Sequence, residues 1–103
     1  MILQEGIEML NFSIEREEEI LGYDSESDEI ITTEIFFVIV SNEVGKKWRH
    51  TENFPNLFEV VNEVGEVVYR ENKEAKSSAM QLMKLLQNKL LSSIENQPNW
   101  SEI

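Results

Sequence analysis

The run from Ile30 to Val40 (IITTEIFFVIV) constrains the fold of this chain more than any other segment. It is rich in β-branched and aromatic residues, which favour strands. Its second half, from Ile35 onward, is apolar at every position, so both faces of such a strand must be covered. We therefore expect a central strand with a helix against one face and aromatic side chains against the other.

The tetrapeptide Asn-Glu-Val-Gly follows twice, at residues 42–45 and 62–65. Asn in the first position and Gly in the fourth suit a type I turn followed by a left-handed residue. Each copy therefore predicts a hairpin, and shared turn chemistry explains the duplication better than a gene repeat. The strands so joined are expected at 30–41 with 46–52 and at 57–61 with 66–70. Pro55 separates the two hairpins, because the residue before a proline is held extended.

A helical period begins after the second hairpin. Asn72 is typical of an N-cap, and Glu74 suits the first turn. The apolar positions then step by three and four along one face: Ala75, Ala79, Leu82, Met83, Leu86, Leu90 and Ile94. This pattern predicts one long helix from Asn72 to about Ile94.

The two ends of the chain give weaker signals. Residues 10–14 alternate apolar and polar side chains, as in a half-buried strand. After Ile14 the chain either continues in the same phase to Glu19 as an acidic strand or leaves the sheet. Residues 22–29 (GYDSESDE) have little to bury and predict a solvated loop, and 95–103 an irregular tail in which Trp100 folds back on the core. Together these features predict a single α+β domain, residues 1–103, in which an antiparallel meander of four to five strands carries one long C-terminal helix on one face.

The net charge of −11 lies entirely in the first 45 residues, which hold 12 acids and one base. The remaining 58 residues hold 8 acids and 8 bases. A field of one sign attracts partners of the opposite sign and repels nucleic acid. The segregation favours an acidic interaction surface, although the same charge is also typical of a solvated, solubilising face.

An acidic ladder is the main candidate site. If residues 15–19 are extended, the carboxylates of Glu15, Glu17 and Glu19 repeat about every 6.7 Å on one face. The predicted partner-binding surface comprises Glu15, Glu17, Glu18, Glu19, Asp24, Glu26, Asp28 and Glu29. Such a row can imitate a nucleic-acid backbone, so the predicted partner is a protein with a basic surface.

A small, acidic, Cys-free α+β chain is similar in type to the inhibitors that phages encode against host nucleases, anti-CRISPR proteins among them. The resemblance is one of class and rests on no motif. It implies a non-enzymatic inhibitor that docks its acidic surface on a basic, nucleic-acid-binding site of another protein.

A basic, aromatic cluster offers the alternative site: Lys46, Lys47, Trp48 and Arg49. On a strand, Trp48 and His50 share one face while Lys47 and Arg49 share the other. The cluster predicts either a nucleic-acid-binding module with a stacking Trp, or a core Trp beneath a basic face that balances nearby acids. A structural homodimer is a third interpretation.

Residues 72–79 (NKEAKSSA) resemble the last helix of double-stranded-RNA-binding domains, and three strands before a helix would fit that family. The family opens with a helix, however, where this chain has an acidic strand. Glu71 and Glu74 also interrupt the basic signature.

The sequence favours no enzyme, cofactor or metal site. His50 is the single histidine, and Cys is absent, which excludes thiolate chemistry. Asp24 begins a stretch like a calcium loop, but the sixth position is Glu29 rather than Gly and the twelfth is Ile35 rather than Glu. No signal peptide or membrane span is expected, so we predict a soluble, cytoplasmic protein.

Overall fold

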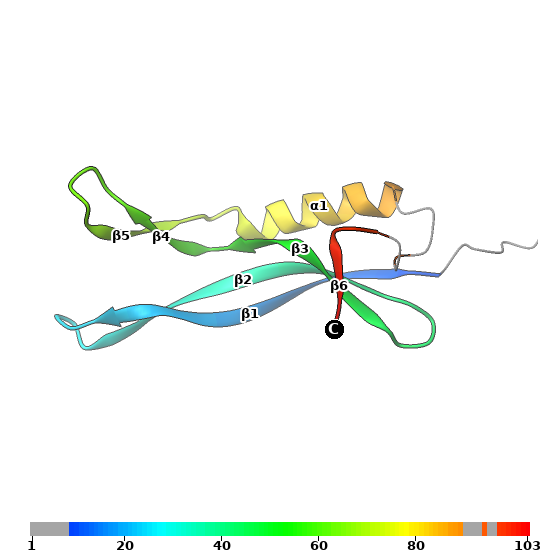
Figure 1. The fold of residues 1–103 in the computed structure, drawn as a ribbon, viewed down its shortest axis with the longest axis horizontal. Helices are drawn as coiled ribbons and strands as arrows, with labels where there is room; N and C mark the ends of the chain where they lie inside the picture. Colours follow the sequence, from blue (N-terminus) through cyan, green and yellow to red (C-terminus); the bar gives the residue numbers. More distant parts are fainter. Residues whose placement is uncertain (1–8, 90–93, 95–96) are drawn as a thin grey trace, which may run out of the picture.

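A computed structural model describes residues 9–89, 94 and 97–103 (Figure 1). The elements in chain order are β1 (Asn11–Asp24), β2 (Glu29–Ser41), β3 (Lys47–Pro55), β4 (Leu57–Val61), β5 (Val67–Glu71), α1 (Ala75–Lys89) and β6 (Trp100–Glu102). The fold is α+β, as predicted, with an antiparallel sheet and one helix packed against it. Residues 90–93, in the C-terminal part of the expected helix, lie outside the described residues.

The main sheet has the strand order β1-β2-β3-β6, so β2 is central, as the run from Ile30 predicted. β1 and β2 pair over almost their whole lengths, from Asn11 opposite Ser41 to Asp24 opposite Glu29. A bulge at Leu21 shifts the register between Ile20 and Gly22. The strand starting near Leu10 therefore runs well beyond Glu19, to Asp24.

Both Asn-Glu-Val-Gly turns have the predicted geometry. In the first, Asn42 Oδ1 accepts the amides of Val44 and Lys46 at 3.2 and 2.9 Å, and Gly45 has a φ of +87°. In the second, Asn62 Oδ1 accepts the amides of Val64 and Glu66 at 3.1 and 2.9 Å, and Gly65 has a φ of +84°. The glycines are required because a positive φ strains other residues.

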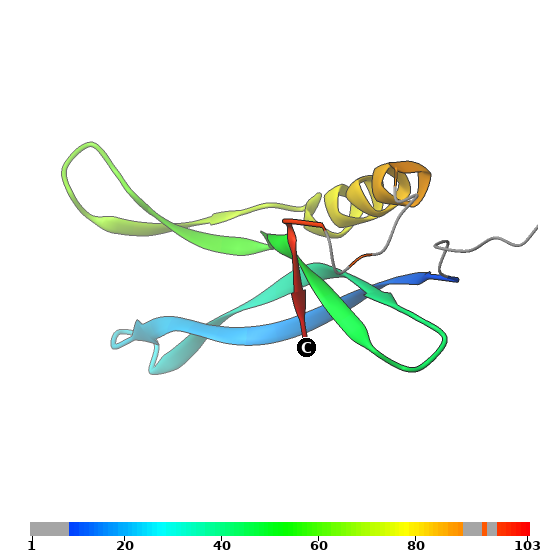
Figure 2. The ribbon, with the colours of Figure 1, turned by 45° about the vertical axis from the view of Figure 1, so that its right-hand side comes forward.

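The second hairpin does not join the meander. β4 and β5 pair only with each other and form a separate two-stranded sheet. The chain leaves the main sheet after Pro55, where the amide of Asn56 still donates to the carbonyl of Glu34 at 2.9 Å. Figures 1 and 2 show this hairpin extending in the same direction as the far ends of β1 and β2.

The helix covers one face of the sheet. Phe36 packs with Ala75 and Ala79 of α1, and Ile14 and Phe54 border this cluster. A second cluster on the same face contains Val40, Trp48 and Ile94, with Leu10, Phe12 and Trp100 around it. Asn72 lies in a turn that leads into the helix, where its Oδ1 accepts the amide of Glu74 at 3.1 Å and its carbonyl accepts that of Ala75 at 3.3 Å. Because α1 begins at Ala75, Glu74 lies just before the first turn, and the prediction that it lies in that turn was wrong.

The opposite face of β2 is covered by charged side chains. The prediction that aromatic side chains cover this face was therefore wrong. Its buried residues are Ile35, Phe37 and Ile39. The Arg49 guanidinium lies 4.2 Å from the centroid of the Phe37 ring. Two ion pairs, Lys47 with Glu15 and Arg49 with Glu17, join β3 to β1 and so pass over β2. Long charged side chains often cover apolar surface with their stems in this way.

Two sequence-predicted boundaries need correction. The acidic loop expected at 22–29 is a turn of residues 25–28 only, because Gly22, Tyr23 and Asp24 continue β1 and Glu29 begins β2. The tail expected to be irregular contains β6, which pairs with the edge of β3 from Trp48 to His50. The position of β6 depends on the open edge of β3 rather than on the strand propensity of its own residues. The prediction that Trp100 folds back on the core is confirmed.

Candidate functional site

Two arms project from the same end of the molecule (Figure 1). We call residues 18–31, at the far ends of β1 and β2, the β1–β2 arm, and residues 57–71 the β4–β5 arm. The first has six acids and no base, and the second has four acids and one base, Arg70. The arms therefore hold −9 of the chain's net charge of −11. The charge asymmetry of the sequence becomes an asymmetry between the arm end and the rest of the protein.

The arms meet where Tyr69 of β5 lies against Gly22 of β1. A Cβ at Gly22 would be 2.7 Å from the Tyr69 hydroxyl, so a glycine permits this approach. At the base of the arms, Thr33 Oγ1 accepts the amide of Leu57 at 3.0 Å and donates to Asn56 Oδ1 at 3.0 Å. These contacts fix the direction of the β4–β5 arm relative to β2.

The acidic ladder has the predicted geometry but a different electrostatic environment. Glu15, Glu17 and Glu19 lie opposite Phe37, Ile35 and Thr33 and so share one face. On this face Glu15 pairs with Lys47 at 3.8 Å, and Glu17 pairs with Arg49. Two of the three ladder carboxylates are therefore neutralised by the basic cluster that the sequence offered as the alternative site.

Asp24 and Asp28 hold the turn of the β1–β2 arm. Asp24 Oδ1 accepts the amide of Glu26 at 3.0 Å, and Asp28 accepts the Tyr23 hydroxyl. The Glu26 amide, followed by the Ser27 hydroxyl, lowers the pKa of Asp24 below its ordinary value. Both carboxylates are exposed, so they add to the negative field of the arm.

The remaining predicted acids are Glu18, Glu19, Glu26 and Glu29. Within the described residues, none of these carboxylates forms an ion pair. Glu18 lies on the opposite face from the ladder, next to the pair that Arg16 forms with Glu34 at 3.6 Å. The unneutralised charge thus begins at Glu18 and follows the arm to its tip.

The basic cluster does not present a stacking surface. The Trp48 side chain is buried in the core with Val40 and Ile94, as the core interpretation predicted. Lys47 and Arg49 form the ion pairs described above, and Lys46 lies 3.7 Å from Glu102 of β6. The three charged residues therefore form ion pairs with neighbouring strands, and Trp48 is part of the core.

His50 is a structural residue in this arrangement. Its ring is buried, packs edge-on against Trp100 at 4.9 Å, and accepts the amide of Glu52 through Nδ1 at 3.1 Å. Burial lowers the pKa of His50, and the nearby Glu52 charge opposes that effect. The neutral ring is therefore favoured at physiological pH.

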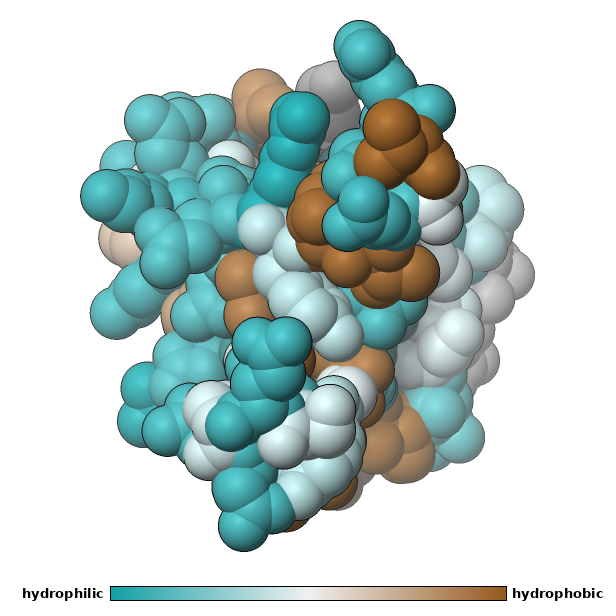
Figure 3. Space-filling model, turned by 90° about the vertical axis from the view of Figure 1, so that its left-hand side faces the viewer, coloured by the Kyte–Doolittle hydropathy of each residue, from teal (hydrophilic) through white to brown (hydrophobic). Residues whose placement is uncertain are grey.

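Sequence reasoning missed an exposed valine patch, which we define as Val61, Val64 and Val67. Val61 and Val67 are cross-strand partners, and Val64 lies in the turn between them. Their exposed fractions are 70%, 76% and 56%. Figure 3 looks onto the arm end and shows hydrophobic side chains gathered in its upper part, among hydrophilic ones. No local signal in the sequence marks these valines as exposed, because their exposure follows from the pairing of β4 and β5 only with each other.

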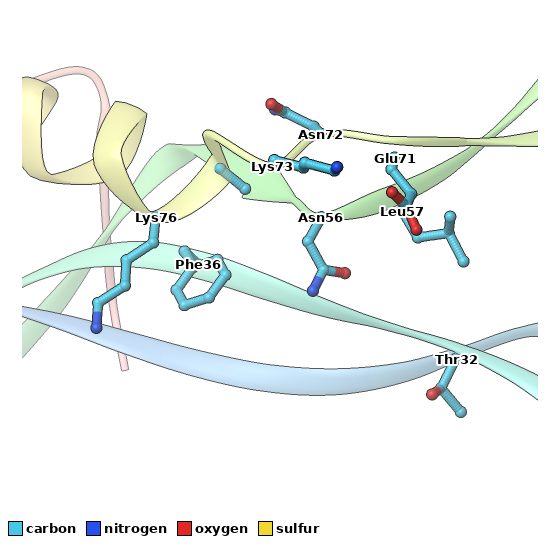
Figure 4. Close-up of a pocket in the computed structure, with 9 residues that line it drawn as sticks. Thr32, Phe36, Asn56, Leu57, Glu71, Asn72, Lys73 and Lys76 are labelled. Carbon is cyan, nitrogen blue, oxygen red and sulfur yellow. The ribbon is translucent and has the colours of Figure 1, made fainter.

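A cavity of about 520 Å³ lies between β2 and the start of α1. In Figure 4, Phe36 and Lys76 lie at one end and Leu57 and Glu71 at the other. Asn56, Asn72 and Lys73 add polar groups to its lining, and none of the described lining residues is a histidine. Its charged groups are a mixture of both signs, which contrasts with the single sign of the arms.

Comparison with protein-family models, with curated proteins and with solved structures finds no match to this chain. In the described part of the chain, no group of three or more His, Asp or Glu residues is placed to hold a metal ion. The described helix is too short and too polar to cross a membrane.

Proposed function

We propose that this protein is a non-enzymatic inhibitor that docks its acidic arm end on a basic, nucleic-acid-binding site of a protein partner. One observation carries the proposal: the two arms hold −9, and the acids from Glu18 to the tip of the β1–β2 arm have no basic partner in the described residues. Unpaired carboxylates on a paired, hydrogen-bonded hairpin keep their mutual spacing. A partner therefore meets a patterned negative surface rather than a mobile charged loop.

The proposed surface lies further along the β1–β2 arm than the ladder of Glu15, Glu17 and Glu19. Glu15 and Glu17 already compensate Lys47 and Arg49, so a partner would have to replace those contacts. Glu19, Glu26 and Glu29 offer their charge without such competition. Long-range attraction of this kind raises association rates and weakens as salt screens exposed charges, within about 8 Å at physiological ionic strength.

Nucleic-acid binding through Lys46 to Arg49 is less well supported. Its aromatic member, Trp48, is 3% exposed and so is not available to stack on a base. The net charge of −11 also repels a polyanion.

The test compares two variants of equal net charge. One replaces Glu19, Glu26 and Glu29 of the β1–β2 arm with Gln, and the other replaces Glu43, Glu52 and Glu74 of the rest of the protein with Gln. Each tagged protein is used to capture proteins from its native host at low salt, and the captured proteins are identified and eluted with high salt. We expect the wild type and the second variant to retain a nucleic-acid-binding protein that the arm variant loses.

The captured protein is then tested for binding of labelled duplex DNA while the wild-type protein is titrated in. Displacement of the DNA is the expected result. Equal capture by the two variants would refute the acidic arm as the interface, and DNA binding that persists at saturation would refute inhibition by occupation of the site.

A further inference from the structure

The valine patch is a set of exposed apolar side chains at the tip of the β4–β5 arm, and the β1–β2 arm also exposes Ile20, Tyr23 and Ile30. Val61 and Val67 face each other across β4 and β5, so their Cβ atoms lie within about 5.5 Å. By strand alternation they share a face with Tyr69, whose hydroxyl reaches Gly22 of the β1–β2 arm. Val61 and Val67 are therefore on the side of the hairpin that faces the other arm.

The surroundings of the patch are acidic. Glu59 shares its face, and Glu63 and Glu66 flank Val64 in the turn. Across from it, the β1–β2 arm adds six further acids and no base. An apolar centre within a charged rim is the usual composition of a protein-binding surface. A surface that only imitated nucleic acid would have no need of the valines.

Resting on the function proposed above, we infer that the valine patch binds a cationic, amphipathic segment of the protein partner. Apolar side chains of that segment pack on Val61, Val64 and Val67, and its Lys or Arg side chains meet the acids of both arms. Charge complementarity selects this occupant. A second copy of the chain would bring another −9 against the first, and like charges across an interface are unfavourable.

The two Asn-Glu-Val-Gly turns provide a matched control. Val44 and Val64 hold the same position in turns of the same geometry and are 80% and 76% exposed. The first turn is followed by Lys46 and Lys47, and the second by Glu66. Val44→Ser thus removes an equally exposed valine from surroundings in which Lys46 and Lys47 pair with acids, outside the strongly negative arms.

The experiment uses two synthetic peptides of equal length and equal lysine content. One carries leucines along one helical face, and the other carries serines at those positions. Binding to the full chain is measured by fluorescence anisotropy for the wild type, Val64→Ser, Val44→Ser, the triple variant Val61→Ser/Val64→Ser/Val67→Ser, and the Glu19, Glu26 and Glu29 to Gln variant. Circular dichroism confirms that each variant is folded.

We expect the wild type to bind the leucine peptide about tenfold more tightly than the serine peptide, because apolar burial adds to charge attraction. The triple variant should lose this preference and bind the serine peptide with the affinity of the wild type. Val64→Ser should weaken binding of the leucine peptide more than Val44→Ser does. The Gln variant should bind both peptides more weakly.

A triple variant that keeps the wild-type preference would overturn the inference and leave the acidic interface standing. If the Gln variant instead bound both peptides with the affinity of the wild type, the acids of the β1–β2 arm would not be the binding surface, and the proposed function would be refuted. A wild-type dimer in sedimentation that the triple variant abolishes would assign the patch to a second copy and also overturn the inference.

Discussion

Thr33 is the residue through which β2 holds the β4–β5 arm, and its hydroxyl can be removed almost without a change of shape. The side chain is 2% exposed. Its Oγ1 accepts the amide of Leu57 at 3.0 Å and donates to Asn56 Oδ1 at 3.0 Å, which also accepts the amide of Glu34 at 3.0 Å. Asn56 in turn accepts the amide of Asn72 through its carbonyl at 2.8 Å, so the start and the end of the arm meet here.

Thr33→Val keeps the β-branched shape and the preference for a strand, but it leaves the Leu57 amide without an acceptor. Asn56 Oδ1 loses one of its two donors and retains the other. An unsatisfied buried donor costs about 1–3 kcal/mol, and the partial exposure of Leu57 favours the lower half of that range, about 1–2 kcal/mol. For a chain of this size, each kcal/mol lowers the melting temperature by about 4–8 °C.

The matched control is Thr32→Val, because Thr32 is adjacent and exposed and its hydroxyl forms no hydrogen bond within the described residues. Urea unfolding followed by circular dichroism should show a lower midpoint for Thr33→Val and a change within about 0.5 kcal/mol for Thr32→Val. Hydrogen exchange should rise most in β4 and β5. Equal midpoints for the two variants would show that the hydroxyl does not hold the arm.

Two further predictions concern the body of the protein. Arg49→Met should change the free energy of unfolding by less than about 1 kcal/mol, because an exposed ion pair contributes little and the buried Nε has no hydrogen-bond partner. Arg49→Ala should cost about 1–2 kcal/mol by uncovering Phe37, and equal urea midpoints for the two variants would contradict this role as cover. The pKa of His50 is lowered in the folded state, so the unfolded chain binds more protons as the pH falls. The contribution of His50 to the free energy of unfolding should therefore be full above about pH 6.5 and decrease as the pH drops below it. Urea midpoints at pH 7.5 and 5.5 should differ more for the wild type than for His50→Gln, and equal differences would exclude His50 as the source.

Local features of the fold were predictable from the sequence. The strand at Ile30 to Val40, both hairpin turns and the turn at Asn72 before the helix depend on residues only a few positions apart. Their chemistry leaves few alternatives, since a positive φ favours Gly and an orphan amide before a helix requires an acceptor. The helix face with Ala75 and Ala79 followed from its period and packs on Phe36 as expected.

Features that depend on register between distant strands were not predictable. Glu17 and Arg49 are 32 positions apart, and their pairing needs both β1 and β3 to be aligned on β2. The valines of the β4–β5 arm have the pattern of core residues, and only the departure of the chain after Pro55 leaves them exposed. The acidic ladder was therefore found correctly as a row, and the interpretation of the basic face as a balance for nearby acids was correct, but its partners Glu15 and Glu17 were not predictable.

The two turns also bear on whether the charge of the arms is a requirement of the fold. The amide of Asn42 donates to the carbonyl of Lys46 at 3.0 Å, and the amide of Asn62 donates to that of Glu66 at 2.9 Å. One hairpin geometry thus accepts a base in the first case and an acid in the second. Since neither turn geometry nor strand pairing selects the sign, the fold does not require the acids of the β4–β5 arm, and the proposed cationic partner would account for them. Solubility alone would be served by acids at either turn, whereas a cationic partner is served only by acids beside the exposed valines.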